Sequence, residues 1–169
     1  PAAAPAAAPA PADAAAFLAA IQACEASADF GGGVALLQQM KDQSLAPDIH
    51  IYNALLGLCA SGAHFEWALA LHREMKEQYS LQPDVSTYRS VIQACCQKDQ
   101  WQWALNIYQE MYNAQVQPCL ATYDALISAC QRAGAEAAEW EQRFVALRQA
   151  ASPQPPEAAP EAAPGAAPE

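Results

Sequence analysis

Basic residues are scarce in this sequence of 169 residues, which has 8 Lys and Arg side chains against 18 Asp and Glu side chains. The formal net charge is therefore -10, whereas proteins that hold nucleic acid mainly through its phosphates need clustered Lys and Arg. The sequence also lacks any run of about 20 apolar residues, the length that a membrane-spanning helix requires. These absences disfavour histone-like and membrane-spanning proteins, and the length suits one domain.

Motifs of the common catalytic and metal sites are missing as well. There is no P-loop, no dinucleotide-binding glycine motif and no nucleophile elbow. The histidines His50, His64 and His72 do not stand at metal-ligand spacing from a cysteine or acidic cluster, so we expect them at the surface or partly packed. Gly31–Gly33 predict a loosened turn rather than a phosphate site. We therefore expect no enzyme activity, no cofactor and no metal ion.

Proline is nearly absent from the centre of the chain, which divides the sequence into three parts. Ten of the 13 prolines lie in residues 1–13 and 151–169, which are otherwise mostly alanine and acidic residues. Such segments favour extended linkers or tails. We expect a Pro/Ala-rich tail at 1–13, a folded domain at 14–150 and a Pro/Ala/Glu-rich tail at 151–169. Since the sequence begins with proline rather than methionine, we expect a processed chain or a fragment.

A period of 35 to 36 residues runs through the central part. The three remaining prolines keep this spacing, and so do one methionine, one cysteine and two aromatic positions. The sets are Pro47, Pro83 and Pro118; Met40, Met75 and Met111; Cys24, Cys59, Cys95 and Cys130; Phe17, Tyr52, Tyr88 and Tyr123; and Phe30, Phe65 and Trp101. A fixed period of this length predicts a protein built from repeated structural units.

Each repeat has the pattern of two helices joined by a short turn. In the second repeat, two runs of apolar residues at helical spacing flank Gly62, which we expect to end the first helix. Such a hairpin cannot bury its apolar face alone, so we predict an all-α solenoid of three to four stacked helix-turn-helix repeats. The repeats lie near 14–48, 49–84, 85–119 and 120–150, and the last has a polar second helix.

Short motifs recur at the same place in these repeats. The first helix opens with YNALL, YRSVI and YDALI, and the second contains EWALALHREM and WQWALNIYQEM. With the period, these motifs resemble the pentatricopeptide repeat (PPR) family over residues 14–150. The resemblance implies an organellar protein. It also implies one of two functions, since most PPR proteins bind single-stranded RNA at one base per repeat, while others are structural subunits of organellar complexes.

The positions at which PPR proteins recognise bases are only partly filled here. The family pairs the fifth residue of a repeat with its last residue. The pairs on this chain are Leu18 with Asp48, Asn53 with Asp84, Arg89 with Cys119, and Asp124 with no clear partner. Only Asn53 with Asp84 matches the type that favours uracil, and Asp84 could instead simply cap the next helix. The branched apolar residue that the family prefers at the second position is replaced by Ala15, His50, Ser86 and Ala121.

Two tryptophans indicate a different kind of surface. Trp67 and Trp103 occupy the same repeat position, which in this family usually faces outward on the second helix, whereas Phe65 and Trp101 should point into the core. We expect Trp67 and Trp103 to form an apolar ridge on the convex side, extended by Tyr112, and to contact a protein partner. The alternative is that they are half buried across the boundary between repeats.

The six cysteines are expected to be buried free thiols. Equivalent positions on stacked repeats lie roughly 8–10 Å apart, which is too far for a disulfide. Free thiols suit a reducing compartment such as a stroma or matrix, and we expect a plastid rather than a mitochondrion.

Two functions follow from these observations. The acidic charge and the second positions favour a non-catalytic structural or docking subunit of an organellar complex, either a photosynthetic complex or a ribosome. Its partners would be protein subunits, and it could touch the periphery of a membrane complex. The alternative is a protein that binds single-stranded RNA, held jointly with other proteins, in transcript processing or translation.

Overall fold

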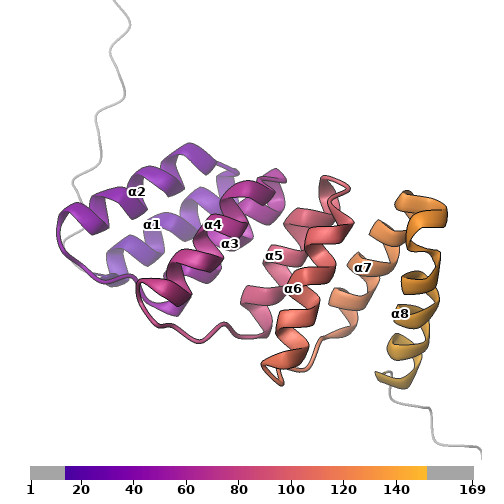
Figure 1. Ribbon diagram of the computed structural model, residues 1–169. Helices are drawn as coiled ribbons and strands as arrows, with labels where there is room; N and C mark the ends of the chain where they lie inside the picture. The colour runs from indigo at the N-terminus through magenta and orange to yellow at the C-terminus, as the bar shows by residue number, and fades with distance from the viewer. Residues whose placement is uncertain (1–13, 152–169) are drawn as a thin grey trace, which may run out of the picture.

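The computed structural model describes residues 14–151, and all the regular structure in this range is helical. The helices are α1 (Ala14–Ser27), α2 (Phe30–Asp42), α3 (Ile49–Gly62), α4 (Phe65–Glu77), α5 (Val85–Gln97), α6 (Trp101–Asn113), α7 (Leu120–Ala133), a short 3-10 helix η1 (Gly134–Ala137), and α8 (Ala138–Ala151). The expected tails lie outside the described residues, except that Ala151 is the last residue of α8. The predicted helical hairpins are confirmed, and they follow one another along the solenoid (Figure 1).

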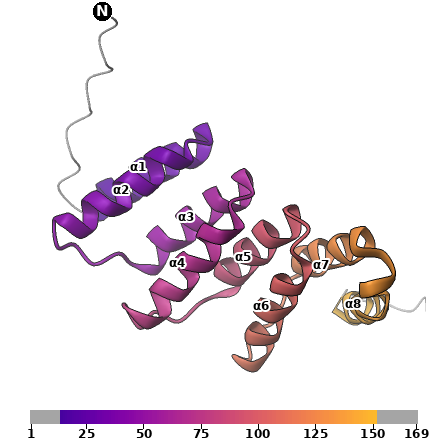
Figure 2. The ribbon, with the colours of Figure 1, turned by 45° about the horizontal axis from the view of Figure 1, so that its top comes forward.

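The helices form two layers that curve together. The first helices of the hairpins, α1, α3, α5 and α7, pack directly on one another and make the inner layer. The second helices, α2, α4, α6 and α8, make the outer layer, and within residues 14–151 none of them contacts another backbone to backbone. Because the inner helices are close and the outer helices spread apart, the inner layer is the concave one (Figure 2).

Local capping explains where the inner helices begin. The Asp48 carboxylate accepts a hydrogen bond from the Ile51 backbone N–H at 2.9 Å, and Asp84 accepts one from the Thr87 N–H at 2.8 Å. Asp84 and Thr87 form a complete capping box at the start of α5. At the end of α3, Gly62 is still helical and Ala63 takes the left-handed conformation with φ 55°, so the predicted glycine stop is displaced by one residue.

The three glycines of the first repeat are not the loosened turn that we expected. Gly31–Gly33 lie in the first turn of α2, and the Asp29 carboxylate caps that helix by accepting from the Gly32 N–H at 3.0 Å. A Cβ on Gly33 would lie only 3.0 Å from Leu58 Cδ2. Glycine therefore permits α2 to pack closely against α3.

The core runs continuously through all four repeats. The inner layer supplies most of it, including the fully buried rings of Tyr52 and Tyr88. Phe65 and Trp101 pack against this core and are partly buried, as predicted. All six cysteines are free; four are buried and Cys24 and Cys119 are half-buried. Burial raises the pKa of Cys59 to about 12, which keeps its thiol neutral.

The fourth repeat departs from the other three. Gly134 takes a positive φ of 68°, η1 follows, and α8 begins only at Ala138. Phe144 is the one fully buried side chain of α8, and it packs edge-on to Tyr108 with ring centroids 4.9 Å apart. The remaining described faces of α8 are largely polar or half exposed, which suits the last unit of a stack. None of the helices in residues 14–151 has the length and hydropathy to cross a bilayer.

Candidate nucleic-acid interface

The inner layer brings together the one pair that the sequence predicts as base-recognising. Asn53 lies on α3 and Asp84 stands just before α5, yet Asn53 Nδ2 donates to both Asp84 carboxylate oxygens, at 3.2 and 3.1 Å. The pair lies between the second and third repeats, with Asp84 exposed to solvent and Asn53 half-buried. Asp84 also caps α5. The same Asp84 side chain therefore caps α5 and accepts hydrogen bonds from Asn53.

A buried hydroxyl holds the other end of the Asn53 amide. Thr87 Oγ1 donates to Asn53 Oδ1 at 2.6 Å and accepts from the Asp84 backbone N–H at 3.2 Å. Burial alone would raise the pKa of Asp84, but the hydrogen bonds from Thr87, Asn53 and Ser86 outweigh it and lower that pKa. The carboxylate therefore remains charged at neutral pH and keeps its hold on the Asn53 N–H group.

The other predicted pairs differ from this one. Leu18 is half-buried against the core and Asp48 only caps α3. Cys119 stands at the start of α7, and its thiol contacts the Thr122 hydroxyl at 3.3 Å. Burial raises the pKa of Cys119, but hydrogen bonds from Thr122 and Ala121, with the nearby charge of Arg89, lower it overall. The charge of Arg89 thus reaches the Cys119 thiol, but no hydrogen bond between their side chains is found in residues 14–151.

Asp124 has a partner that the sequence did not indicate. Arg148 of α8 forms an ion pair with it, with Nε 2.6 Å from Asp124 Oδ1. This bridge joins the fifth position of the last repeat to the last described helix. The Asp124 carboxylate is consequently engaged within the protein and is partly neutralised toward any phosphate that approaches it.

The second positions of the repeats remain open to solvent. All four are exposed on the inner helices: Ala15, His50, Ser86 and Ala121. His50 is the only one of these four with a flat ring, and an imidazole is able to stack on a base. The surface around Asn53 therefore offers one hydrogen-bonding amide and one ring, but no cluster of cations.

The outer layer has a different chemistry. Trp67 and Trp103 are each 46% exposed, so about half of each side chain is covered by the protein. Trp67 also touches the preceding repeat, where its ring meets Phe30 with centroids 5.8 Å apart. Tyr112 is 65% exposed, but it stands nine residues after Trp103, half a turn further around the helix, and lines a separate hollow with Val116. Tyr112 therefore does not extend the ridge of Trp67 and Trp103, although the sequence predicted that it would.

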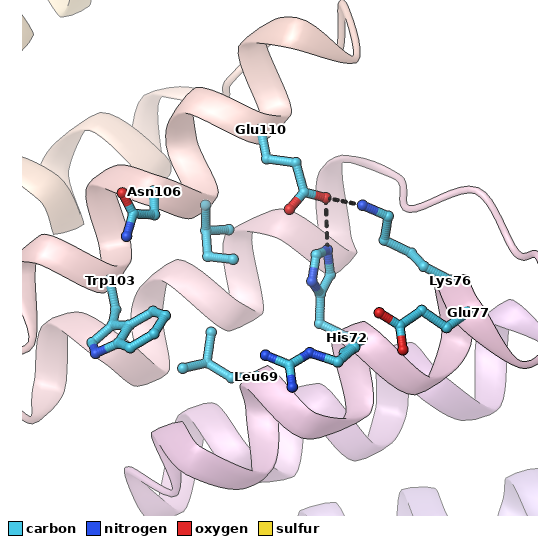
Figure 3. Close-up of a pocket in the computed structure, with 9 residues that line it drawn as sticks. Leu69, His72, Lys76, Glu77, Trp103, Asn106 and Glu110 are labelled. Carbon is cyan, nitrogen blue, oxygen red and sulfur yellow. Dashed lines mark hydrogen bonds and ion pairs between the residues drawn. The ribbon is translucent and has the colours of Figure 1, made fainter.

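A hollow of about 370 Å³ separates α4 from α6. Trp103 lies at one end of it, and His72, Lys76 and Glu110 lie at the other (Figure 3). Lys76 Nζ is 2.6 Å from Glu110 Oε1, and the Tyr88 hydroxyl donates to the same oxygen at 3.2 Å. This hollow exists because the outer helices spread apart.

The sequence predicted that His72 lies at the surface or is partly packed, and this prediction is wrong. It is only 4% exposed, and its Nε2 lies 3.4 Å from Glu110 Oε1 without a hydrogen-bond partner among residues 14–151. Burial lowers the pKa of His72, although the Glu110 carboxylate raises it in opposition. The imidazole is therefore neutral at neutral pH.

The network of a lysine, a glutamate and a tyrosine hydroxyl recurs one repeat earlier, although it was not predicted from the sequence. Lys41 contacts Glu74 at 2.7 Å, and the Tyr52 hydroxyl donates to Glu74 at 2.5 Å. These three residues are the counterparts of Lys76, Glu110 and Tyr88, 35 or 36 residues earlier. The regular spacing of these Lys and Glu residues is the feature of the sequence that could have predicted both networks. Each network ties one outer helix to the next repeat.

Residues 14–151 contain no group of three or more His, Cys, Asp or Glu side chains arranged to hold a metal ion. The arrangement instead offers hydrogen bonding at Asn53 and an aromatic surface at Trp67 and Trp103.

The sequence and the fold both have known relatives. A family model described as the pentacotripeptide-repeat region of PRORP matches residues 9–150, most of the chain. The chain belongs to the pentatricopeptide repeat family. PPR repeats are generally non-catalytic RNA-binding modules that engage one base per repeat. No curated protein gives a significant sequence match.

Solved PPR structures share this fold. The PPR domain of Arabidopsis thaliana protein-only RNase P 1 in complex with tRNA matches with a TM-score of 0.72 at 16% identity, over 82% of this chain and 72% of that chain. Maize PPR10 matches with a TM-score of 0.70 at 20% identity, over 82% of this chain and 19% of that chain. PPR10 in complex with an 18-nt psaJ RNA element matches with a TM-score of 0.70 at 23% identity, over 82% and 20%. This chain thus spans about a fifth of PPR10.

Proposed function

We propose that this chain is a non-catalytic PPR module that binds single-stranded RNA on its inner layer and recognises one base, a uracil, at Asn53. The observation that carries the proposal is the assembled pair of Asn53 and Asp84, whose hydrogen bonds cross from one repeat to the next. The RNA-bound PPR structures that share the fold support it.

The hydrogen-bonding capacity of Asn53 suits a uracil. Its amide has two N–H donors and an oxygen with two lone pairs. One N–H group is shared between the two Asp84 carboxylate oxygens and Thr87 takes one lone pair, which leaves one donor and one acceptor for a base. The Watson–Crick edge of uracil offers the O4 acceptor beside the N3–H donor, so the two sets match.

One such contact gives weak affinity. Stacking contributes about 1–3 kcal/mol per base, and residues 14–150 carry 14 acids against 8 bases, a net of -6, because four of the 18 acids lie outside this range. We therefore propose that a second protein holds the rest of the RNA, while this chain contributes recognition of a single position.

Replacing Asn53 with alanine is the first test. The wild-type chain should bind oligouridine more tightly than oligoadenosine of equal length, since a good bidentate contact contributes about 1–3 kcal/mol of discrimination. Asn53→Ala should abolish that preference while leaving the helical content unchanged. Chemical shifts of the ¹⁵N-labelled chain report whether the helices are retained, and their changes during titration at low salt measure the affinity for each oligonucleotide. Asn106→Ala on the outer layer is the matched control, and an equal loss in that variant would refute the assignment.

A second candidate function is docking to protein subunits of a larger organellar assembly, with a plastid complex as the first choice of host. The partly exposed tryptophans favour it, because Trp67 and Trp103 present aromatic rings on the outer layer, and tryptophan is enriched at binding hot spots. The two functions use opposite layers, so one chain can carry both.

Substitution of both tryptophans tests the docking function. Trp67→Ala with Trp103→Ala should reduce recovery of partner subunits from organelle extract by tenfold or more, since a single hot-spot residue contributes about 2 kcal/mol or more. The extract is treated with ribonuclease before capture, and the recovered proteins are quantified by mass spectrometry. Partners that disappear with the RNA, or that are recovered equally by the double variant, would contradict direct docking through these rings.

A further inference from the structure

We propose that Thr87 is a positioning residue that sets the base specificity of Asn53 by holding its amide in one orientation. This inference rests on the proposed RNA function. Thr87 lies in the first turn of α5 and is completely buried, so no base or phosphate can touch it. Its effect on RNA must pass through the side chain that it holds.

The hydrogen bonds around Thr87 leave its hydroxyl one favoured arrangement. The hydroxyl has a single proton, and its shortest contact is to Asn53 Oδ1 at 2.6 Å, against 3.0 Å to Asp84 Oδ1. The Asp84 backbone N–H donates to the same hydroxyl at 3.2 Å and occupies a lone pair. The proton of Thr87 is therefore directed toward Asn53.

Together Asp84 and Thr87 hold the amide at both ends. Asp84 receives the Nδ2 group, and Thr87 supplies a proton to Oδ1. A flipped amide would place Oδ1 against the Asp84 carboxylate and would bring two acceptors together. The remaining N–H and lone pair of Asn53 therefore point outward in fixed directions. A base is distinguished only when these two groups keep their order.

Removal of the Thr87 hydroxyl should release one end of the amide. In Thr87→Val the shape is preserved, but Oδ1 loses its donor and the amide can rotate about its terminal bond. Stacking does not depend on amide direction, so affinity for RNA should persist while the preference for uracil weakens. The lost hydrogen bond predicts that the ratio of uridine to adenosine affinity falls by about three- to tenfold.

The next repeat offers a matched control. Thr122 occupies the same repeat position, 35 residues later, and is also completely buried. Its hydroxyl contacts the Cys119 thiol at 3.3 Å rather than an amide. Thr122→Val therefore makes the same chemical change at an equivalent helix start without touching Asn53.

The experiment compares wild type, Thr87→Val, Thr87→Ser and Thr122→Val. Each is titrated with oligouridine and oligoadenosine, and the Asn53 side-chain N–H resonances are recorded without RNA. We expect the two Asn53 resonances to shift and to exchange faster only in Thr87→Val, where the uridine preference also falls. Thr87→Ser keeps the hydroxyl and should therefore show the wild-type Asn53 resonances and the wild-type uridine preference. Thermal melting reports whether each variant is folded.

The outcomes separate this inference from the proposed function. If the wild-type chain shows no preference for uridine, the RNA function itself fails. If wild type prefers uridine and Thr87→Val does so equally, Asn53 acts without Thr87 and the positioning role is wrong. An equal loss in Thr122→Val would assign the effect to the general loss of a buried hydroxyl at a helix start, and would also overturn the inference.

Discussion

Phe144→Ala is expected to destabilise the protein by about 3–5 kcal/mol, the range for deletion of a buried aromatic ring, and to detach α8. Phe144 is the only fully buried side chain of α8. Its ring meets those of Tyr108 and Trp140, with centroids 4.9 and 5.8 Å away. Among the described elements, the backbone of α8 contacts only α7 and η1, so no further repeat within residues 14–151 compensates for the cavity.

Amide hydrogen exchange measures this effect locally. Protection should fall first in α8 and next in α7, while α1 to α4 keep most of theirs, because each repeat of a solenoid depends mainly on its neighbours. Gln142→Ala, an exposed change on the same helix, serves as the control and should lie within about 0.5 kcal/mol of wild type. Unchanged exchange in α8 of Phe144→Ala would contradict the packing described here.

Glu110→Ala is expected to cost about 1–3 kcal/mol, because it removes one acceptor shared by several groups and leaves buried polar atoms without a partner. The Tyr88 hydroxyl and Lys76 both bond to Glu110 Oε1, and His72 lies 3.4 Å from it. The Tyr88 ring is buried, and its hydroxyl loses the carboxylate that accepts its hydrogen bond.

The contributions can be separated with two further variants. Lys76→Ala removes only a pair exposed at the surface and should change the free energy of unfolding by about 0–1 kcal/mol. Glu110→Gln keeps an acceptor for Tyr88 and should fall between the two. The pKa of His72, followed by NMR, should decrease further in Glu110→Ala, because the Glu110 carboxylate is the group that raises it. A loss in Lys76→Ala equal to that in Glu110→Ala would show that the surface ion pair dominates.

The repeat architecture could be predicted because a solenoid repeats its chemistry with its structure. Residues such as Met75 and Tyr52 recur at one period since each fills the same place in a hairpin. The outward placement of Trp67 and Trp103 follows from the same register. The contact between Asn53 and Asp84 follows from the family resemblance, and the hydrogen bonds place it in space.

Features that depend on contacts between repeats could not be predicted in this way. His72 has a polar side chain, so the sequence alone predicts partial exposure, whereas α5 and α6 cover it in the structure. The contact of Thr87 could not be predicted from its local sequence, because its hydrogen-bond partner, Asn53, lies 34 residues earlier. Gly33 lies in α2, close against α3, whereas local propensity alone suggested a turn.

The two layers give the chain two separate surfaces. The inner helices carry the only predicted base-recognition pair that matches a known type, held by a buried hydroxyl, whereas the outer helices spread and leave aromatic rings beside hollows. The curvature of the solenoid therefore determines which residues lie on the concave layer, where we propose that RNA binds, and which lie on the convex layer, where we propose protein docking. The excess of acidic over basic residues in 14–150 makes the recognition of one base, rather than tight binding, its proposed contribution.

The most direct test of this account is photo-crosslinking to an oligonucleotide that carries a single 4-thiouridine, followed by identification of the linked peptide. We predict crosslinks within α3 and the start of α5, around Asn53 and Ser86, and a loss of these crosslinks in Asn53→Ala. Crosslinks that instead map to the outer helices near Trp103, or that persist unchanged in Asn53→Ala, would contradict recognition of uracil by the inner layer.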